Sequence, residues 1–407
     1  MPKKLLMISY RFPWPEEKGG YNLRILNFAK LLKKEYDLSL LTLVENKKEE
    51  INVKNLKEEK IFKEIIYFHH SKAKEYKNAF LGLFSKFPLQ VHYYYSKDLM
   101  SWLQKNYQNY NFLYFSTLRT AIYNYQLKTK NQFPAVIDLI DSISLNYSEA
   151  KKWSKNLFWQ LIYKIEIPRL KNFEKKIIES NKFKKILISS EFDKNYLLSN
   201  INQSVFNVAV IPNGVKEELI QYSHSNLEED IISFFGKMDT QPNQDAAIFF
   251  AKEIFPAICK NFQFRNLKFY IIGADPTKKI KNLEKENENI KVTGYLKNPY
   301  DILEKSKIIV SPLRFGAGIQ NKVLEAMALG KTVVSSKVSI RGVSGAEPGK
   351  HFELIDSFSP RLWKEKIIEL MLDQKKREKI GKEAKKFIEE NYRWEKIGGK
   401  LLNEISL

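Results

Sequence analysis

The sequence predicts an α/β protein of two lobes, each built on a parallel β-sheet. The chain has 407 residues and is 43% hydrophobic, which is enough for two hydrophobic cores and unusually large for one. Short apolar segments alternate with helical patterns in both halves of the chain. These segments are apolar throughout rather than at every second residue, as expected for strands covered by helices on both faces.

The first lobe opens with a strand, a loop, a helix and a second strand. An apolar run at Lys4–Ser9 is followed by a Pro/Gly-rich loop, Phe12–Gly20, and the next strand is predicted at Leu38–Val44. The helix between them places four apolar residues on one face: Ile25, Phe28, Ala29 and Leu32. Further strands are predicted at Phe112–Phe115, Ala135–Asp138, Ile186–Ser189 and Val208–Ile211.

The second lobe repeats this alternation. Its predicted strands are Ile231–Phe235, Leu267–Ile272, Ile290–Thr293, Ile308–Ser311 and Thr332–Ser335. Its predicted helices include Gln244–Cys259, Asn298–Lys305 and Lys322–Leu329, and the chain is helical from Leu362 onward. A polar stretch, Ser223–Asp230, is the expected linker. The predicted domains are therefore 1–222 and 223–385, followed by a C-terminal helix at 386–407 that is a candidate to return to the first lobe.

Composition excludes several classes of protein. No apolar run approaches the roughly 18 to 20 residues needed to cross a bilayer, and no signal peptide is recognisable. The single cysteine, Cys259, excludes an intrachain disulfide and a cysteine metal site. We expect a cytoplasmic protein. The formal charge of +21 indicates an anionic partner, but by itself does not choose among nucleic acid, lipid headgroups and phosphorylated small molecules.

Glycines follow the ends of several predicted strands. In open parallel sheets, ligands collect at the carboxyl ends of the strands, where glycine lets a phosphate approach the backbone. Gly19 and Gly20 precede the first helix, and Gly236, Gly273 and Gly294 each follow a strand of the second lobe. These positions are candidates for binding a phosphorylated ligand.

The segment Pro312–Gly330 is the most informative, because a glycine loop there runs directly into a helix. Gly316 and Gly318 leave backbone amides open to an anion. Lys322 and Glu325 stand three residues apart and share one helix face. A cation for a diphosphate and a carboxylate for ribose hydroxyls suit a nucleotide sugar. The alternative interpretation is a simple ion pair within the helix, but the glycine loop that precedes the two residues favours the binding site.

These motifs, taken in order, resemble the retaining family 4 glycosyltransferases, and within them the exopolysaccharide-type sugar transferases. The motifs are Gly19-Gly20, Ile211-Pro-Asn-Gly-Val215, Phe235-Gly-Lys-Met238, Gln241-Pro-Asn243, Thr293-Gly-Tyr295 and Lys322-Val-Leu-Glu-Ala-Met-Ala328. The resemblance spans nearly the whole chain. It implies the GT-B architecture, in which two Rossmann-like lobes face each other and the C-terminal lobe holds the donor.

The resemblance also implies a set of donor-binding residues. They are Gly236, Lys237, Gly273, Gly294, Tyr295, Gly316, Ala317, Gly318, Ile319, Gln320, Asn321, Lys322 and Glu325. Glu325 matches the second acid of the family's Glu-x7-Glu signature, but Ala317 stands where the first acid is expected. Lys237 matches one of the family's two basic residues for the diphosphate, whereas Asn243 lies near the place of the other. Lys322 is a candidate to supply that second charge.

The acceptor side is less well matched. The family's frequent histidine in the first lobe is absent from Phe115–Arg119. Arg11 with Gly19 and Gly20, and His92 in a Tyr-rich stretch, are the acceptor-side candidates, and Asp141 is the catalytic candidate alongside Lys237 and Lys322. His92 could equally be an ordinary surface histidine, and Asp141 could cap the helix that follows it.

We therefore expect transfer of a sugar from a nucleotide diphosphate sugar to a hydroxyl, with retention implied by the resemblance. No Asp-x-Asp motif is present, and neither a metal nor another cofactor is expected. Two alternatives stay open: a glycosyltransferase-like protein that binds without catalysis, and a sugar-nucleotide epimerase on the same scaffold. Nucleic-acid binding lacks any recognised motif.

A basic and aromatic stretch, Lys151–Lys185, suggests where the acceptor is met. Its apolar residues are Trp153, Phe158, Trp159, Ile162 and Tyr163. Helices of this kind lie on anionic membranes, so we expect a peripheral position on the cytoplasmic membrane face and a lipid-linked or polysaccharide acceptor. The alternative is an ordinary helix that packs its aromatic residues on the first lobe.

Overall fold

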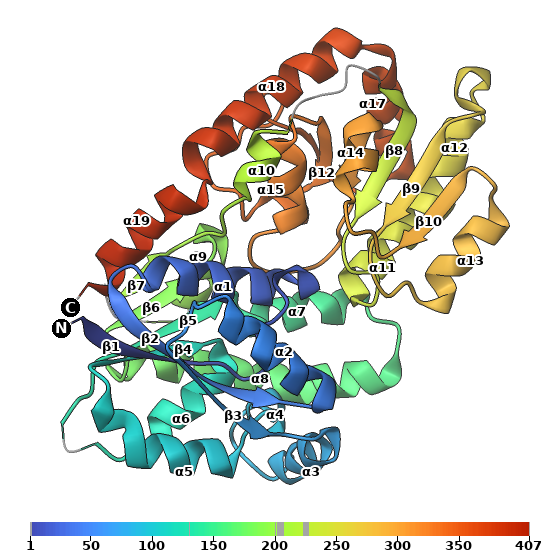
Figure 1. Ribbon diagram of the computed structural model, residues 1–407. Coiled ribbons are helices and arrows are strands. Elements are labelled where there is room, and N and C mark those ends of the chain that lie inside the picture. Colours follow the sequence, from blue (N-terminus) through green and yellow to red (C-terminus); the bar gives the residue numbers. More distant parts are fainter. Residues whose placement is uncertain (1, 130, 200, 202–206, 223–227, 407) are drawn as a thin grey trace. The chain divides into compact units, whose positions relative to one another are not determined.

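The computed structural model describes residues 2–129, 131–199, 201, 207–222 and 228–406. The chain forms two compact units (Figure 1). Unit 1 consists of Met1–Pro212 and Ile397–Leu407, and unit 2 of Asn213–Lys396. The two-domain α/β architecture predicted from the sequence is confirmed.

Unit 1 contains a seven-stranded parallel sheet with the order β3-β2-β1-β4-β5-β6-β7. Its strands are β1 (Lys3–Ile8), β2 (Tyr36–Val44), β3 (Glu64–His69), β4 (Phe112–Ser116), β5 (Ala135–Ile140), β6 (Lys185–Ile188) and β7 (Val208–Val210). The strand order reverses between β1 and β4, which makes their carboxyl ends the expected place for a ligand. The edge strand β3 was not predicted.

Most helices of unit 1 begin at a capping side chain. They are α1 (Gly20–Leu32), α2 (Lys47–Glu58), α3 (Lys72–Gly82), α4 (Leu89–Tyr93), α5 (Lys97–Asn106), α6 (Ala121–Gln126), α7 (Ile143–Trp153), α8 (Leu157–Glu179) and α9 (Glu191–Leu198), with short 3-10 turns at Glu16–Lys18, Tyr107–Asn109 and Leu118–Thr120. Helices α2, α3, α5, α7, α8 and α9 begin after Asn46, Ser71, Ser96, Ser142, Asn156 and Ser190. Each of these side chains accepts a hydrogen bond from a backbone N–H of the first turn, which satisfies an otherwise unpaired donor.

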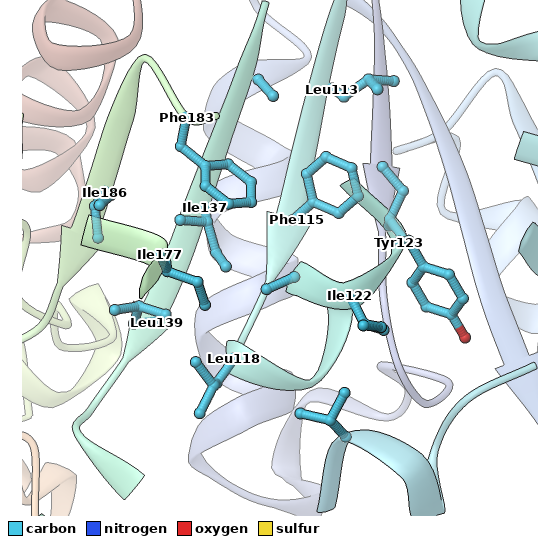
Figure 2. Close-up of a cluster of buried hydrophobic side chains, with 14 of the residues drawn as sticks. Leu113, Phe115, Leu118, Ile122, Tyr123, Ile137, Leu139, Ile177, Phe183 and Ile186 are labelled. Atoms are coloured by element: carbon cyan, nitrogen blue, oxygen red, sulfur yellow. The ribbon is translucent and has the colours of Figure 1, made fainter. Parts of the chain in front are cut away.

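Apolar side chains from neighbouring strands and helices form the core of unit 1. In Figure 2, Phe115 of β4 lies beside Ile137 of β5 with Phe183 close to both, and Leu113 and Leu139 lie at opposite ends of the same cluster. All five are almost completely buried. Burial of such side chains is the main favourable contribution to folding, and here it fixes the strands whose ends carry the polar residues described below.

Unit 2 contains a six-stranded parallel sheet with the order β10-β9-β8-β11-β12-β13. Its strands are β8 (Glu229–Phe235), β9 (Lys268–Ile272), β10 (Ile290–Gly294), β11 (Ser306–Ser311), β12 (Val333–Ser336) and β13 (Glu353–Ile355). Successive residues of β8 enter different hydrophobic clusters: Phe234 packs in one and Phe235 in the other. Both faces of this sheet are therefore buried, as the continuous apolar runs predict. The three-residue strand β13 was not predicted.

Six helices lie between these strands along the described chain: α11 (Gln241–Phe249), α12 (Phe255–Cys259), α13 (Lys278–Glu286), α14 (Tyr300–Lys305), α15 (Asn321–Ala328) and α16 (Lys337–Ile340), with a 3-10 turn at Phe262–Phe264. Helix α10 (Glu217–Ile220) precedes β8, and α17 (Pro360–Leu372) and α18 (Gln374–Asn391) follow β13. The last helix, α19 (Trp394–Ile405), begins in unit 2 and continues into unit 1. A π-helical turn, Phe250–Ile254, separates α11 from α12 within the stretch predicted as one helix. Pro256 follows it, and proline cannot donate a backbone hydrogen bond.

The units divide ten residues before the boundary expected at 222/223. Val215, Leu219 and Ile220 are buried in a hydrophobic cluster of unit 2, and the backbone N–H of Val215 donates to Tyr392 O at 2.8 Å. The Asn-Gly turn at Asn213 therefore opens unit 2. Of the expected linker, Ser223–Leu227 lies outside the described residues, and Glu229 and Asp230 begin β8.

The C-terminal boundary also differs from the expected 385/386, because α18 packs within unit 2 as far as Lys396. The remaining residues belong to unit 1, where Gly398 lies against Leu31 of α1 and Lys185 forms a salt bridge with Glu404 at 2.6 Å. No helix in the described part of the chain is long and apolar enough to cross a membrane.

Candidate nucleotide-sugar site

The carboxyl ends of β8, β9 and β11 carry the glycine motifs of unit 2. The strand order reverses between β8 and β11, which is the position where parallel sheets of this kind bind ligands. Gly236 follows β8, Gly273 follows β9, and the loop Pro312–Gln320 leads from β11 to α15. The structure thus gathers three of the sequence motifs at one edge of one sheet.

Gly236 and Gly273 have no room for side chains. Both have positive φ, +144° and +151°, a conformation that residues with a Cβ rarely adopt. A Cβ on Gly273 would lie 1.8 Å from Gly236 O, and one on Gly236 would lie 2.8 Å from Asn243 Nδ2 and 3.3 Å from Lys322 Nζ. The two glycines therefore allow the backbone, Asn243 and Lys322 to approach each other closely.

The loop before α15 is held by side chains that bond to its carbonyls. Arg341 donates to Gly316 O at 2.6 Å, and Gln320 donates to Ala317 O at 3.3 Å. Gly318 has a φ of +68°. Because the carbonyls are engaged and no side chain caps α15 at Gln320, the positive end of the helix dipole is available to an anion.

Lys322 points toward the centre of this edge. Its ammonium group donates to Asn243 Oδ1 and lies 4.7 Å from the centre of the Phe234 ring. Burial lowers the pKa of Lys322 to about 7, and the charge of Glu325 opposes this shift. The two groups that Lys322 contacts, Asn243 and Phe234, are neutral, so an anionic ligand would supply a counter-charge in direct contact with the ammonium group.

Glu325 turns to different partners. The Tyr300 hydroxyl donates to Glu325 Oε2 at 3.4 Å. Burial raises the pKa of Glu325 to about 7, and the charge of Lys216 is the largest effect in the opposite direction. Among the described residues, no salt bridge joins Glu325 to Lys322; each side chain has another partner. The alternative of an ion pair within the helix is therefore not what the structure shows.

The remaining donor-side candidates lie on neighbouring strand ends of unit 2. Lys237 forms salt bridges with Asp239 at 2.8 Å and Asp275 at 3.4 Å; burial acts to lower its pKa, but the two carboxylates raise it overall. Tyr295, after Gly294 at the end of β10, is 67% exposed. Ile319 is nearly buried. The side chain of Asn321 accepts a hydrogen bond from Asn213 at 2.7 Å, which connects the Asn-Gly turn to the start of α15.

In unit 1, a hydroxyl network fixes the loop after β1. Tyr21 lies within hydrogen-bonding distance of Ser9 Oγ (2.6 Å) and Ser116 Oγ (2.8 Å), and burial raises its pKa well above the usual value. Gly20 begins α1, and Gly19 before it has a φ of +152°. The exposed Arg11 packs its guanidinium over Tyr21, 4.7 Å from the ring centre.

Arg119, which no sequence motif marks, lies at the centre of a cluster in unit 1. Its guanidinium lies 4.9 Å from the ring centre of Tyr10 and 5.6 Å from that of Tyr94, and it donates to Gln90 Oε1. Its Nε is buried and has no hydrogen-bond partner. We call Tyr10, Gln90, Tyr94, Arg119 and Asp141 the Arg119 cluster.

Asp141 joins this cluster through its charge. Burial and the nearby Asp193 raise the pKa of Asp141 to about 7, while Arg119 opposes the shift. Ser142 rather than Asp141 caps α7, so capping does not explain this carboxylate. The residues Thr117 and Ile140, near Arg119 and next to Asp141, have φ values of +67° and +68°. Such strain in β-branched residues is concentrated at functional sites.

The polar residues Asp138 and His92 of unit 1 are engaged elsewhere. Asp138 is fully buried and accepts hydrogen bonds from Arg24 at 2.7 and 2.9 Å and from Tyr114 at 2.9 Å, so it holds the fold together. His92 packs against Phe87 and Gly82, and burial together with the charge of Arg169 lowers its pKa. The described contacts of its side chain do not include the Arg119 cluster.

Comparison with known proteins narrows the interpretation of these sites. Residues 229–373 match the family model described as Glycosyl transferases group 1. The C-terminal domain is therefore of the group 1 glycosyl transferase type, and the match includes Lys237, Lys322 and Glu325. A curated relative, poly(ribitol-phosphate) alpha-N-acetylglucosaminyltransferase of Staphylococcus aureus (strain COL), is 26% identical over 238 residues, which is 57% of this chain and 46% of that enzyme. The chain thus matches less than half the length of this relative.

Solved structures share the fold of the whole chain. The crystal structure of TarM superimposes with a TM-score of 0.72 at 16% identity, covering 100% of this chain and 99% of that one. Anabaena HepE in complex with UDP superimposes with a TM-score of 0.65 at 15% identity, covering 99% of each chain. Together with the two parallel sheets, these similarities show the GT-B fold. Among the described residues, no group of three or more His, Cys, Asp or Glu side chains could hold a metal ion.

Proposed function

We propose that this protein is a glycosyltransferase that moves a sugar from a nucleotide diphosphate sugar to a hydroxyl group. The proposal rests mainly on the surroundings of Lys322. Lys322, a half-buried cation that touches neutral partners, stands at an uncapped helix start beside Gly236. This arrangement suits a diphosphate, which supplies the missing negative charge.

In the proposed reaction, the bond between the anomeric carbon and the diphosphate oxygen breaks as the acceptor hydroxyl oxygen forms a new bond to that carbon. The nucleoside diphosphate leaves with the negative charge, and the acceptor hydroxyl loses its proton. Lys322, Lys237 and the N-terminus of α15 stabilise the departing diphosphate, because fixed charges placed at developing charge lower the barrier most. Glu325 accepts hydrogen bonds from the ribose hydroxyls.

Uridine diphosphate sugars are the first donors to test. The printed name of the S. aureus relative describes N-acetylglucosamine transfer, and the HepE structure contains UDP. We propose retention of the anomeric configuration on the family resemblance. The acceptor is proposed to be a polysaccharide or a lipid-linked sugar, with the Arg119 cluster, Arg11 and the loop at Gly19 and Gly20 on the acceptor side of unit 1.

Asp141 is the proposed acceptor of the hydroxyl proton. It is the carboxylate of the Arg119 cluster, it does not cap α7, and its pKa of about 7 suits proton transfer near neutral pH. Arg119 positions it through charge.

A panel of nucleotide sugars tests the proposal. A donor that binds only the folded state raises the melting temperature. The donor that stabilises the protein most is then incubated with polysaccharide and lipid-linked acceptors, and release of the nucleoside diphosphate together with the anomeric configuration of the product is followed by NMR. No stabilisation by any member of the panel contradicts the proposal.

We also propose that transfer needs no divalent metal, because Lys237 and Lys322 supply positive charge for the diphosphate. Activity is expected to persist in excess EDTA. Complete loss of activity in EDTA that magnesium or manganese restores contradicts this part of the proposal.

A non-catalytic binding function is the second candidate, and Ala317 favours it, because the carboxylate that the family places there is missing. The two functions differ in one measurement. A binding protein is stabilised by a nucleotide sugar but releases no nucleoside diphosphate with any acceptor, whereas the enzyme does both.

A further inference from the structure

Exposed apolar side chains of this protein are concentrated in two short stretches of unit 1. Of the fifteen large hydrophobic residues exposed among the described residues, five lie between Tyr76 and Phe84 and five between Trp153 and Leu161. The other five are scattered over the two units. Single exposed apolar residues are normal, but groups of them mark interaction surfaces.

The first stretch is the end of α3 and the turn after it. Its exposed residues are Tyr76, Phe80, Leu81, Leu83 and Phe84, and Phe84 keeps 84% of its surface exposed. The turn is held in place rather than loose, because Arg169 of α8 donates to Gly82 O at 3.1 Å and Leu83 O at 2.8 Å. The apolar side chains are therefore presented to solvent by a fixed backbone.

The second stretch joins α7 to α8. Its exposed residues are Trp153, Leu157, Phe158, Trp159 and Leu161, and Leu157 keeps 85% of its surface exposed. Tyr163, which the sequence grouped with them, is buried and stacks with Trp159 at 5.9 Å between ring centres. Tyr163 thus packs on the fold, whereas the end of α7 exposes Trp153 and the start of α8 exposes Phe158 and Trp159.

Positive charge surrounds both stretches. Ala150–Ile165 carries four lysines and no acid, and Lys72–Lys86 carries four lysines and one acid, Glu75. Glu75 is buried. Two of the lysines, Lys72 and Lys74, have acidic partners elsewhere. Lys77, Lys86, Lys151, Lys152, Lys155 and Lys164 are exposed.

We propose that these two stretches, here called the α3/α8 surface, bind a bilayer of anionic lipids. Leu, Phe and Trp side chains enter the boundary between headgroups and acyl chains, and the surrounding lysines attract the negative headgroups. These lysines favour an anionic bilayer over a second copy of this chain, because the second copy would bring the same positive charge and be repelled. The proposal does not depend on the proposed activity and is tested without any donor.

Co-sedimentation of the full chain with vesicles tests it. Vesicles of phosphatidylcholine alone are compared with vesicles of phosphatidylcholine and phosphatidylglycerol at low salt. Binding is expected only to the second kind and should weaken as salt screens the charges. Equal recovery with both kinds, or no recovery with either, overturns the proposal.

Paired variants locate the surface. Phe80→Ser with Phe84→Ser, and separately Leu157→Ser with Phe158→Ser, should each weaken binding by about tenfold or more. The control, Leu362→Ser with Leu372→Ser, removes exposed leucines of α17 and should bind as the wild type does. Lys152→Glu with Lys155→Glu should also weaken binding by about tenfold or more. Its control, Lys279→Glu with Lys285→Glu on α13, lowers the net charge equally and should bind more tightly than that variant.

Sedimentation velocity of the same proteins tests the alternative that the α3/α8 surface binds a second copy of the chain. Equal binding by the surface variants and their controls overturns the proposal. A wild-type dimer that the Ser variants convert to monomer, without any vesicle binding, also overturns it and assigns the surface to a second copy of the chain.

Discussion

Lys322 and Glu325 stand one turn apart on α15 and yet turn to different partners. Lys322 reaches Asn243 and the Phe234 ring, and Glu325 reaches the Tyr300 hydroxyl. A helical ion pair would stabilise the isolated helix by only about 0.2 to 0.5 kcal/mol. Here two half-buried charged groups are kept apart, each with a pKa of about 7. Perturbed groups of this kind are concentrated at functional sites.

Binding of UDP should take up a proton through Lys322. Because its pKa in the free protein is about 7, most Lys322 side chains are neutral at about pH 8, and a bound diphosphate raises the pKa and recharges them. Affinity should therefore fall as pH rises above about 7. Calorimetry at about pH 8 in buffers of different ionisation enthalpy measures the uptake. Lys322→Met should abolish it, and an unchanged uptake in that variant contradicts this role.

Titration of Asp141 should make the transfer rate fall on the acidic side of its pH profile. Its pKa of about 7 means that the carboxylate loses its charge as pH falls below that value, so kcat/KM should decrease there. Asp141→Asn should lower the rate and remove this decrease. Glu174 also has a pKa raised to about 7 by burial, but it is bonded to Ser142 and Ser144. Glu174→Gln should keep the decrease, and its loss in both variants contradicts the assignment.

The sequence predicted the interior strands of both sheets and two of the four edge strands, β7 and β10, but missed the other two, β3 and β13. The strands β1 and β4 are apolar and buried on both faces, so their composition identifies them. The edge strand β3 begins with the exposed Glu64 and ends with the exposed His69, and β13 has three residues. Edge strands are often short or polar, because one side of the strand is left unpaired. In β3 and β13, composition therefore gives little signal.

The final helix offers a test of packing with two adjacent glycines. A Cβ on Gly398 would lie 2.4 Å from Leu31 Cδ2, whereas one on Gly399 meets nothing within 4 Å. Gly399→Ala should stabilise the protein by about 0.5 to 1 kcal/mol, since glycine is unfavourable within a helix. Gly398→Ala should destabilise it by about 1 kcal/mol net, because overpacking exceeds that gain. Thermal unfolding of both variants measures the difference, and equal melting temperatures contradict the packing of α19 on α1.

The two units differ in how far their candidate sites can be recognised in the sequence. In unit 2, local motifs of glycine, lysine and glutamate predict the site, because each lies directly after a strand of one sheet. In unit 1, Arg119 stands out only through its contacts with Tyr10, Gln90 and Tyr94, which lie in other segments of the chain. No local pattern marks such a cluster. The exposed residues of α3 escaped prediction for the same reason: helical periodicity does not reveal which apolar face is left without a partner.

The central claim is that unit 2 binds a nucleotide diphosphate sugar through Lys322 and Glu325. Calorimetric titration of UDP into the wild type, Glu325→Gln and Lys322→Met tests it most directly. Loss of the charged acceptor in Glu325→Gln should remove about 1.5 to 3 kcal/mol, which is roughly tenfold or more in affinity, at an unchanged melting temperature without ligand. Lys322→Met should also weaken binding and lose the proton uptake. Wild-type affinity in both variants, or no binding of UDP and the other nucleoside diphosphates by any of the three proteins, contradicts the claim.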